Sequence, residues 1–200
     1  MAKLYFRYAA MSAGKSTQLL QIDHNYRENA QSTMLWTAGL DDRYGRGYIT
    51  SRLGPQRPAL LFDAKTAFAR ELDWSVSCVL IDEAQFLSVG QVQELHAWAH
   101  QHDVPVMCFG LRSTFQGLPF EGSAALLALA DDLEELKAVC LCGKKATMNI
   151  RLDERGHRER RGAVVGIGGN DRYRSVCARC FYTPSDDEMT EREGAGHGLP

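Results

Sequence analysis

The spacing of apolar residues predicts a chain that alternates between β-strands and α-helices. Short apolar runs or apolar–polar alternation predict four strands, at residues 3–8, 33–37, 76–81 and 105–111. Apolar residues at helical spacing predict four helices, at residues 16–28, 64–72, 89–102 and 123–130. Strands that alternate with helices indicate an α/β fold, a mostly parallel sheet flanked by helices.

The composition of the chain changes just before Cys140. From there to Cys180, cysteine, arginine and glycine dominate, and the long apolar periodicity ends. We therefore expect a first domain over residues 1–138 and a second over residues 139–184. The last segment, 185–200, carries one Leu and one Met among charges and glycines, which predicts a disordered tail.

Length and charge narrow the class of protein. The 200 residues suffice for one sizeable core, and 44% apolar with 24% charged residues is typical of a soluble globular protein. The net charge of −2 provides no basic surface for nucleic acid or an anionic membrane. No segment approaches the roughly 18 consecutive apolar residues of a membrane span, and the start has no leader pattern. We expect a cytoplasmic protein with neither nucleic acid nor membrane as a partner.

A candidate phosphate-binding loop joins the first strand to the first helix. Its sequence is AAMSAGKS, and it comprises Ala9, Ala10, Met11, Ser12, Ala13, Gly14, Lys15 and Ser16. Small residues let backbone N–H groups surround phosphates, the lysine reaches the β- and γ-phosphates, and the serine hydroxyl ligates magnesium. The strict pattern has glycine where this chain has Ala9. On the GKS tripeptide alone, an ordinary strand-to-helix turn is the alternative.

A second element typical of phosphate enzymes ends the apolar strand at 76–81. Asp82 and Glu83 stand where such folds hold a magnesium-coordinating aspartate and often a catalytic carboxylate. Taken alone, the pair fits a solvated strand end equally well. Both elements, however, follow predicted strands, and open α/β sheets bind ligands at the carboxyl ends of their strands. Together they predict a nucleotide site, with Ser16 and Asp82 as candidate ligands of Mg²⁺.

Four of the six cysteines form two close pairs, Cys140, Cys142, Cys177 and Cys180. Two thiolate pairs supply the four soft ligands of a tetrahedral structural zinc, and a closed set leaves no position open for chemistry. Two disulfides or four free thiols are the alternatives, which are less common in a cytoplasmic chain. Cys78 and Cys108 lie within predicted buried strands, so we expect them in the core.

Two histidines form a weaker candidate metal pair. His96 and His100 are four residues apart on a predicted helix, so they share one face. No acidic residue stands at matching spacing, and a solvated helix surface is therefore the favoured interpretation.

The motifs taken in order resemble one family. They are AAMSAGKST, the DDRYG segment from Asp41, LIDEAQF from Leu80, GLRSTFQG from Gly110, CLC at Cys140 and IGGNDRYRSVCARC from Ile167. This series closely resembles the type II thymidine kinases of bacteria over about residues 2–182. Each motif occurs in other phosphate-loop enzymes, but their order together with this cysteine set is specific.

The resemblance implies a P-loop (RecA-like) kinase domain and a small zinc-binding lasso domain. It implies transfer of the γ-phosphoryl group of ATP to the 5′-hydroxyl of thymidine, and also of deoxyuridine, in deoxynucleotide salvage. Glu83 would be the general base and Asp82 would serve Mg²⁺. Asp41 and Arg43 would lie near the triphosphate, and Gln85 would belong to the nucleotide site. A homotetramer and feedback inhibition by thymidine triphosphate (dTTP) are implied as well.

The resemblance also assigns residues to the nucleoside. Those that would wall the thymine pocket are Met11, Phe86, Leu111, Phe115 and Phe120. Tyr173 would contact the nucleoside. The lasso, whose main chain would bind the base, corresponds to Val164, Val165, Gly166, Ile167 and Gly168. Gly166 departs from the β-branched residue usual there, and Ala9 from the loop's first glycine.

Two other function classes remain as alternatives. The DEAQ sequence at Asp82 is similar to a helicase box, which suggests a nucleic-acid-stimulated ATPase. A chain of this length lacks room for a second motor domain, and its charge offers no basic track. A zinc-ribbon interaction module with a structural nucleotide site is the other, but the presence of both Lys15 and Glu83 argues against it.

Overall fold

A six-stranded sheet, parallel at every pairing, forms the centre of the protein. The computed structural model describes residues 1–39, 47–164 and 172–183. The strand order is β5-β2-β6-β7-β1-β8. The strands are β1 (Leu4–Ala9), β2 (Thr33–Ala38), β5 (Leu60–Phe62), β6 (Cys78–Ile81), β7 (Val106–Leu111) and β8 (Asp132–Glu135). Because β6, β7 and β1 are neighbours, the loops after their carboxyl ends lie side by side.

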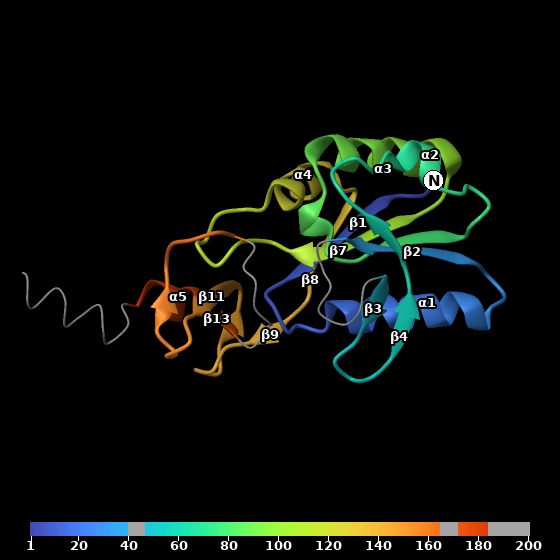
Figure 1. Ribbon diagram of the computed structural model, residues 1–200. Helices are drawn as coiled ribbons and strands as arrows, with labels where there is room; N and C mark the ends of the chain where they lie inside the picture. The colour runs from blue at the N-terminus through green and yellow to red at the C-terminus, as the bar shows by residue number, and fades with distance from the viewer. Residues whose placement is uncertain (40–46, 165–171, 184–200) are drawn as a thin grey trace, which may run out of the picture.

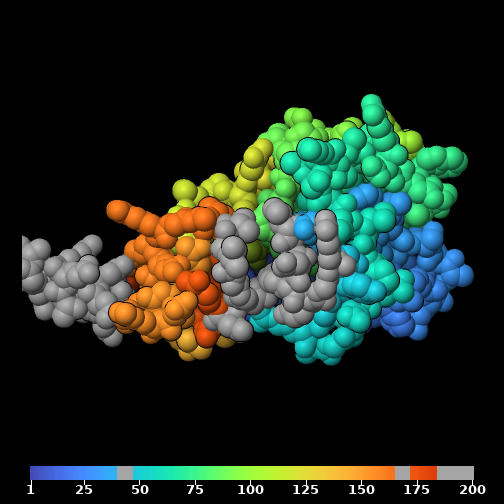
Figure 2. Space-filling view, viewed as in Figure 1, coloured from blue at the N-terminus to red at the C-terminus, as the bar shows by residue number. Residues whose placement is uncertain are grey.

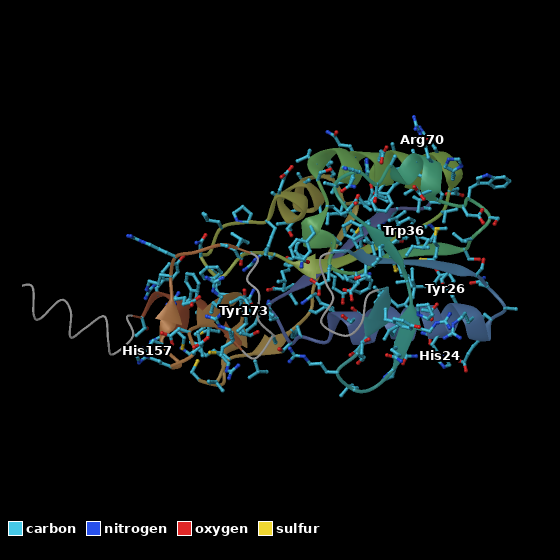
Figure 3. All side chains as sticks on the ribbon, in the orientation of Figure 1. His24, Tyr26, Trp36, Arg70, His157 and Tyr173 are labelled. Atoms are coloured by element: carbon cyan, nitrogen blue, oxygen red, sulfur yellow. The ribbon has the colours of Figure 1, made fainter. Side chains whose placement is uncertain are left out.

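Helices cover both faces of the sheet, which confirms the predicted α/β class (Figure 1). One face carries α1 (Lys15–Glu28), and the other carries α2 (Phe68–Glu71), α3 (Val89–His102) and α4 (Glu121–Leu129). Trp36 packs edge-on against Phe68 in the core beneath α2 and α3, whereas Tyr26 lies on the α1 side (Figure 3). Among the described residues, no helix is long and apolar enough to cross a membrane.

The predicted strands and three of the predicted helices are confirmed to within a few residues. The helix expected at 64–72 is wrong over its first half, because only Phe68–Glu71 is helical. The Asp63 side chain accepts the N–H of Lys65 at 2.8 Å, and Thr66 Oγ1 accepts that of Asp63 at 3.0 Å. These local bonds hold a turn in place of a helix.

A small lobe of short antiparallel strands follows the main sheet. Figure 2 shows it gathered at one end of the molecule. Its elements are β9 (Ala138–Val139), β10 (Lys145–Ala146), β11 (Met148–Leu152), β12 (Arg158–Glu159), β13 (Tyr173–Val176) and α5 (Ala178–Tyr182). Its apolar core includes Val176 and Phe181 and extends to Ala10 of the candidate phosphate loop. The two parts of the protein thus meet at that loop.

The segment after β6 is packed tightly against α4. Residues Ala84–Phe86 form a short 3₁₀ turn, η1. A Cβ atom on Gly122 would lie 2.5 Å from the carbonyl oxygen of Leu87 and 2.9 Å from that of Ala84. Only glycine permits this approach, and the approach fixes the backbone that carries Glu83 and Gln85.

Candidate active site

The candidate phosphate loop folds around a cavity of about 500 Å³. Ser12 and Gly14 have positive φ angles, of 60° and 82°. They turn the chain so that α1 begins at Lys15 with its first N–H groups free of helical partners. The cavity is lined by residues 11–17 of the loop and helix start, Thr37, residues 48–53, Asp82, Glu83 and Leu111. A helix N-terminus above such a cavity favours a bound anion.

The loop and the end of β6 meet at a direct hydrogen bond. Ser16 Oγ donates to Asp82 Oδ2 at 2.7 Å, and Lys15 Nζ donates to the carbonyl oxygen of Ala10 at 3.2 Å. Asp82 is only 4% exposed. Burial and then the neighbouring Glu83 raise its pKa to about 7, against the opposing effects of Ser16, the Glu83 N–H and Lys15. A buried carboxylate in this state gains free energy from a nearby cation.

Glu83 occupies a left-handed backbone conformation, with φ 53° and ψ 35°. Its N–H donates to Asp82 Oδ1 at 2.9 Å, which closes the turn after the strand. Gln85 Nε2 donates to Glu83 Oε2 at 2.5 Å and so fixes the carboxylate at the cavity wall. Non-glycine residues in this conformation are strained and concentrate at functional sites.

Gln85 is itself held by the neighbouring strand. Its Oε1 accepts the N–H of Leu111 at 3.0 Å, and the residue is 2% exposed. A Cβ atom on Gly110 would lie 2.9 Å from that same Oε1. A side chain at position 110 would displace the Gln85 amide. Glycine there lets this amide bond to both Leu111 of β7 and Glu83. In the structure, Gln85 contacts Glu83 and stands behind the cavity lining.

A hairpin that the sequence did not mark as part of the site closes one side of the cavity. It consists of β3 (Tyr48–Thr50) and β4 (Gln56–Pro58). Thr17 Oγ1 and Ser51 Oγ lie 2.6 Å apart, and Arg57 Nε lies 3.1 Å from Oδ2 of the fully buried Asp23 on α1. These contacts place Arg52 so that its Nη1 donates to Ser12 Oγ of the loop at 2.9 Å.

Only part of the expected nucleoside pocket lines this cavity. Met11 and Leu111 do. Phe86 and Phe120 pack edge to face, with ring centroids 5.9 Å apart. Phe115 is buried, and the Arg151 guanidinium carbon lies 3.9 Å from the centroid of its ring. Val164 is 37% exposed and Tyr173 lies on β13 (Figure 3). The expected residues Asp41, Arg43, Val165, Gly166, Ile167 and Gly168 lie outside the described residues.

The small lobe binds both the backbone N–H and the backbone carbonyl oxygen of Met11 in the phosphate loop. Asn149 Oδ1 on β11 accepts the Met11 N–H at 2.8 Å, and Ser175 Oγ on β13 donates to the Met11 carbonyl oxygen at 2.5 Å. Asn149 and Ser175 are directly opposite each other in the β11–β13 ladder. Asn149 Nδ2 also donates to the carbonyl oxygen of Ser113 after β7, at 3.3 Å.

The four clustered cysteines converge within this lobe. Their sulfur atoms all lie within 4.8 Å of one another, and none of the six cysteines forms a disulfide. Cys142 Sγ is 3.4 Å from Cys140 Sγ and 3.6 Å from Cys177 Sγ. Sulfur ligands of a tetrahedral zinc ion lie about 3.8 Å apart. The set therefore has the composition and spacing of a zinc site. Cys78 and Cys108 are fully buried in the core, as expected.

The electrostatics of the thiols also suit a metal ion. The backbone N–H groups of Cys142 and Cys177 lower the pKa of Cys140, and that of Cys180 lowers the pKa of Cys177. The pKa of Cys180 is raised in turn, first by its contact with Cys177 and then by those with Cys142 and Cys140. Thiols packed this closely share protons, whereas a divalent cation holds all four as thiolates.

The comparisons with known proteins agree with this geometry. A family model described as thymidine kinase matches residues 2–181. A protein named thymidine kinase from Chromobacterium violaceum is 57% identical over 182 residues, which cover 91% of this chain and 99% of the relative. One from Albidiferax ferrireducens is 54% identical over 196 residues, with 98% and 100% covered. The chain belongs to the thymidine kinase family. Family membership confirms the resemblance and does not favour the ATPase interpretation.

Among solved structures, the Pif1 helicase from Candida albicans aligns with 68% of this chain and 36% of its own. The TM-score is 0.39 at 13% identity, a likeness too weak to inform fold or function.

Replacing Ser175 by alanine tests whether the hydrogen bond from the small lobe to Met11 holds the phosphate loop in place. Loss of one hydrogen bond of about 0.5–1.5 kcal/mol should raise KM for ATP by about 2- to 10-fold. Ser113→Ala is the matched control, because the buried Ser113 Oγ has no hydrogen-bond partner among the described residues. Steady-state kinetics with each substrate varied separately provide the measurement. Equal KM values for ATP in both variants would contradict the assigned role.

Proposed function

We propose that this protein transfers the γ-phosphoryl group of ATP to the 5′-hydroxyl of thymidine, giving ADP and thymidine 5′-monophosphate. The observation that carries the proposal is the position of Glu83. Its carboxylate stands at the wall of a phosphate-loop cavity, in a left-handed turn held by Asp82 and Gln85. Membership of the thymidine kinase family supplies ATP and thymidine as the substrates that fit this site.

Charge neutralisation is assigned to groups that surround the cavity. Phosphoryl transfer needs positioned charge more than covalent chemistry. Lys15 and the backbone N–H groups of the loop would hold the β- and γ-phosphates. Arg52 lies on the hairpin side of the cavity, next to Ser12, and we assign it to the triphosphate as well. Arg43 and Asp41 keep their proposed place near the triphosphate on the family resemblance.

Ser16 and Asp82 fit a magnesium ion. Their oxygen atoms lie 2.7 Å apart at the cavity, and Mg²⁺ prefers hydroxyl and carboxylate oxygen ligands. Burial and the neighbouring Glu83 raise the pKa of Asp82, and a cation bound next to it would favour its ionised form. When bound with ATP, the ion would neutralise phosphate charge and orient the γ-phosphoryl group.

Glu83 would accept the proton of the nucleoside 5′-hydroxyl. A general base must lie next to the reacting hydroxyl with a fixed orientation. Gln85 donates to Oε2 of the Glu83 carboxylate and so holds that carboxylate at the cavity wall. Gln85 is thus a positioning residue for Glu83, supported by the N–H of Leu111 on β7.

The nucleoside would lie between the two lobes. Met11 and Leu111 at the cavity and Phe86 with Phe120 beside it offer apolar surface for a base. We propose that Phe115 and Tyr173 complete this pocket and that the lasso, residues 164–168, binds thymine through its backbone. Such recognition would also accept deoxyuridine, and dTTP would inhibit by bridging the base and phosphate sites.

The domain organisation, cellular location and oligomeric state of the enzyme are proposed from the sequence and the family resemblance. We propose that residues 1–138 form a kinase domain and that residues 139–184 form a second domain. One Zn²⁺ bound by the four cysteines would stabilise this second domain. The enzyme would act in the cytoplasm in deoxynucleotide salvage, as a homotetramer that needs no nucleic acid.

A nucleoside panel combined with Glu83→Gln tests the proposed reaction. With ATP and Mg²⁺, the wild type should phosphorylate thymidine and deoxyuridine, with little product from deoxycytidine or purine nucleosides. Loss of the general base in Glu83→Gln should lower kcat by about 10²- to 10⁴-fold while ATP still binds. The exposed Glu154 is the control, since Glu154→Gln should keep full turnover. No product from any nucleoside would overturn the proposal, and full turnover in Glu83→Gln would remove Glu83 from its role.

Arg52→Met tests the hairpin arginine. Removing one charged hydrogen-bond donor, worth about 1.5–3 kcal/mol, should lower kcat/KM for ATP by about 10- to 100-fold. The control is Arg70→Met on α2, whose side chain points away from the body of the molecule (Figure 3). Indistinguishable kinetics for the two variants would show that Arg52 makes no contact with the triphosphate.

A further inference from the structure

A cluster of two imidazoles and one carboxylate lies outside the site described above. His96 and His100 are one turn apart on α3, and Asp131 lies between α4 and β8. His100 Nε2 is 3.1 Å from Asp131 Oδ2, and His96 Nε2 is 3.7 Å from Asp131 Oδ1. The acidic group that the helical spacing lacked thus comes from a distant part of the chain.

The backbone fixes the carboxylate of this cluster. Asp131 Oδ2 accepts the N–H of Leu4, the first residue of β1, at 2.8 Å. His100 Nε2 lies 3.1 Å from the same oxygen atom. The Asp131 carboxylate is therefore held in a fixed position at the start of the strand.

The two imidazoles are accessible and arranged around this carboxylate. Their rings pack edge to face with centroids 4.8 Å apart. The side chains of His96, His100 and Asp131 are 33%, 31% and 27% exposed, so an ion can reach them from solvent. One ligand atom from each residue lies within 4.8 Å of the other two.

We propose that His96, His100 and Asp131 bind a divalent transition-metal ion of the Zn²⁺ class. Nitrogen and oxygen ligands around a tetrahedral zinc lie about 3.4 Å apart, a spacing that His100 and Asp131 nearly have and that His96 reaches by a small rotation. Three protein ligands leave one position for water, and imidazole with carboxylate suits zinc, nickel or copper ions.

The position of this second site separates it from the phosphoryl-transfer chemistry. Asp131 bonds to Leu4 at the amino end of β1, whereas the phosphate loop follows the carboxyl end of the same strand at Ala9. Six residues of strand span about 20 Å. A metal here would link α3 to the start of β1 and to the entry of β8, and thereby stabilise the folded protein.

Zinc titration of the protein with one equivalent of Zn²⁺ already on its cysteines tests the proposal. Calorimetry should detect one further equivalent of Zn²⁺ per chain, accompanied by a rise in Tm. His100→Gln and Asp131→Asn should each weaken this second binding by at least about tenfold and abolish the rise in Tm. Circular dichroism without added metal should show both variants folded.

His24→Gln is the matched control. His24 Nε2 also lies near a carboxylate, at 3.3 Å from Glu28 Oε1, but among the described residues no second imidazole joins this pair. This variant should bind the second Zn²⁺ as the wild type does. Failure of the wild type to bind a second equivalent would overturn the proposal and leave the cluster as a histidine–aspartate ion pair. Equal binding by wild type and His100→Gln would also overturn it.

Discussion

The arrangement of the nucleotide site depends on how Met11 is held. A loop built mainly of small residues has few side chains with which to fix its own shape, and its backbone N–H groups bind phosphates only when they converge. Asn149 and Ser175 supply that constraint from outside the loop, on the N–H and the carbonyl oxygen of one residue. Both belong to strands of the lobe that ends in the cysteine cluster. A zinc ion on these cysteines would therefore support the phosphate site through the two strands.

A second constraint acts at the end of β6. The strained conformation of Glu83 persists because its surroundings leave it no alternative: Gln85 binds its carboxylate, and Gly110 and Gly122 let β7 and α4 approach without a side chain between them. Each glycine is required by a contact that lies far away in sequence. The position proposed for the general base thus depends on close packing at these two glycines.

Much of this architecture could be predicted from the sequence because it rests on local patterns. β6 is apolar on both faces, β1 alternates buried apolar residues with more exposed ones, and the loop between β1 and α1 has its own signature. The edge strand β8 was missed because its sequence, DLEE, is polar where an edge strand faces water. Arg52 and Asp131 were missed for another reason: each acquires its partners only when distant segments fold together. Spacing along one helix could show His96 with His100, but not the carboxylate that faces them.

Amide hydrogen exchange at Met11, measured with zinc bound and after removal of zinc by a chelator, tests most directly whether the small lobe holds the phosphate loop. If the small lobe holds the phosphate loop, chelation should speed exchange at Met11 by at least about tenfold, as expected for the loss of a hydrogen bond worth about 1.4 kcal/mol. The amides of β1, β6 and β7 should stay protected. If the small-lobe amides exchange freely after chelation but exchange at Met11 is unchanged, the small lobe does not hold the phosphate loop.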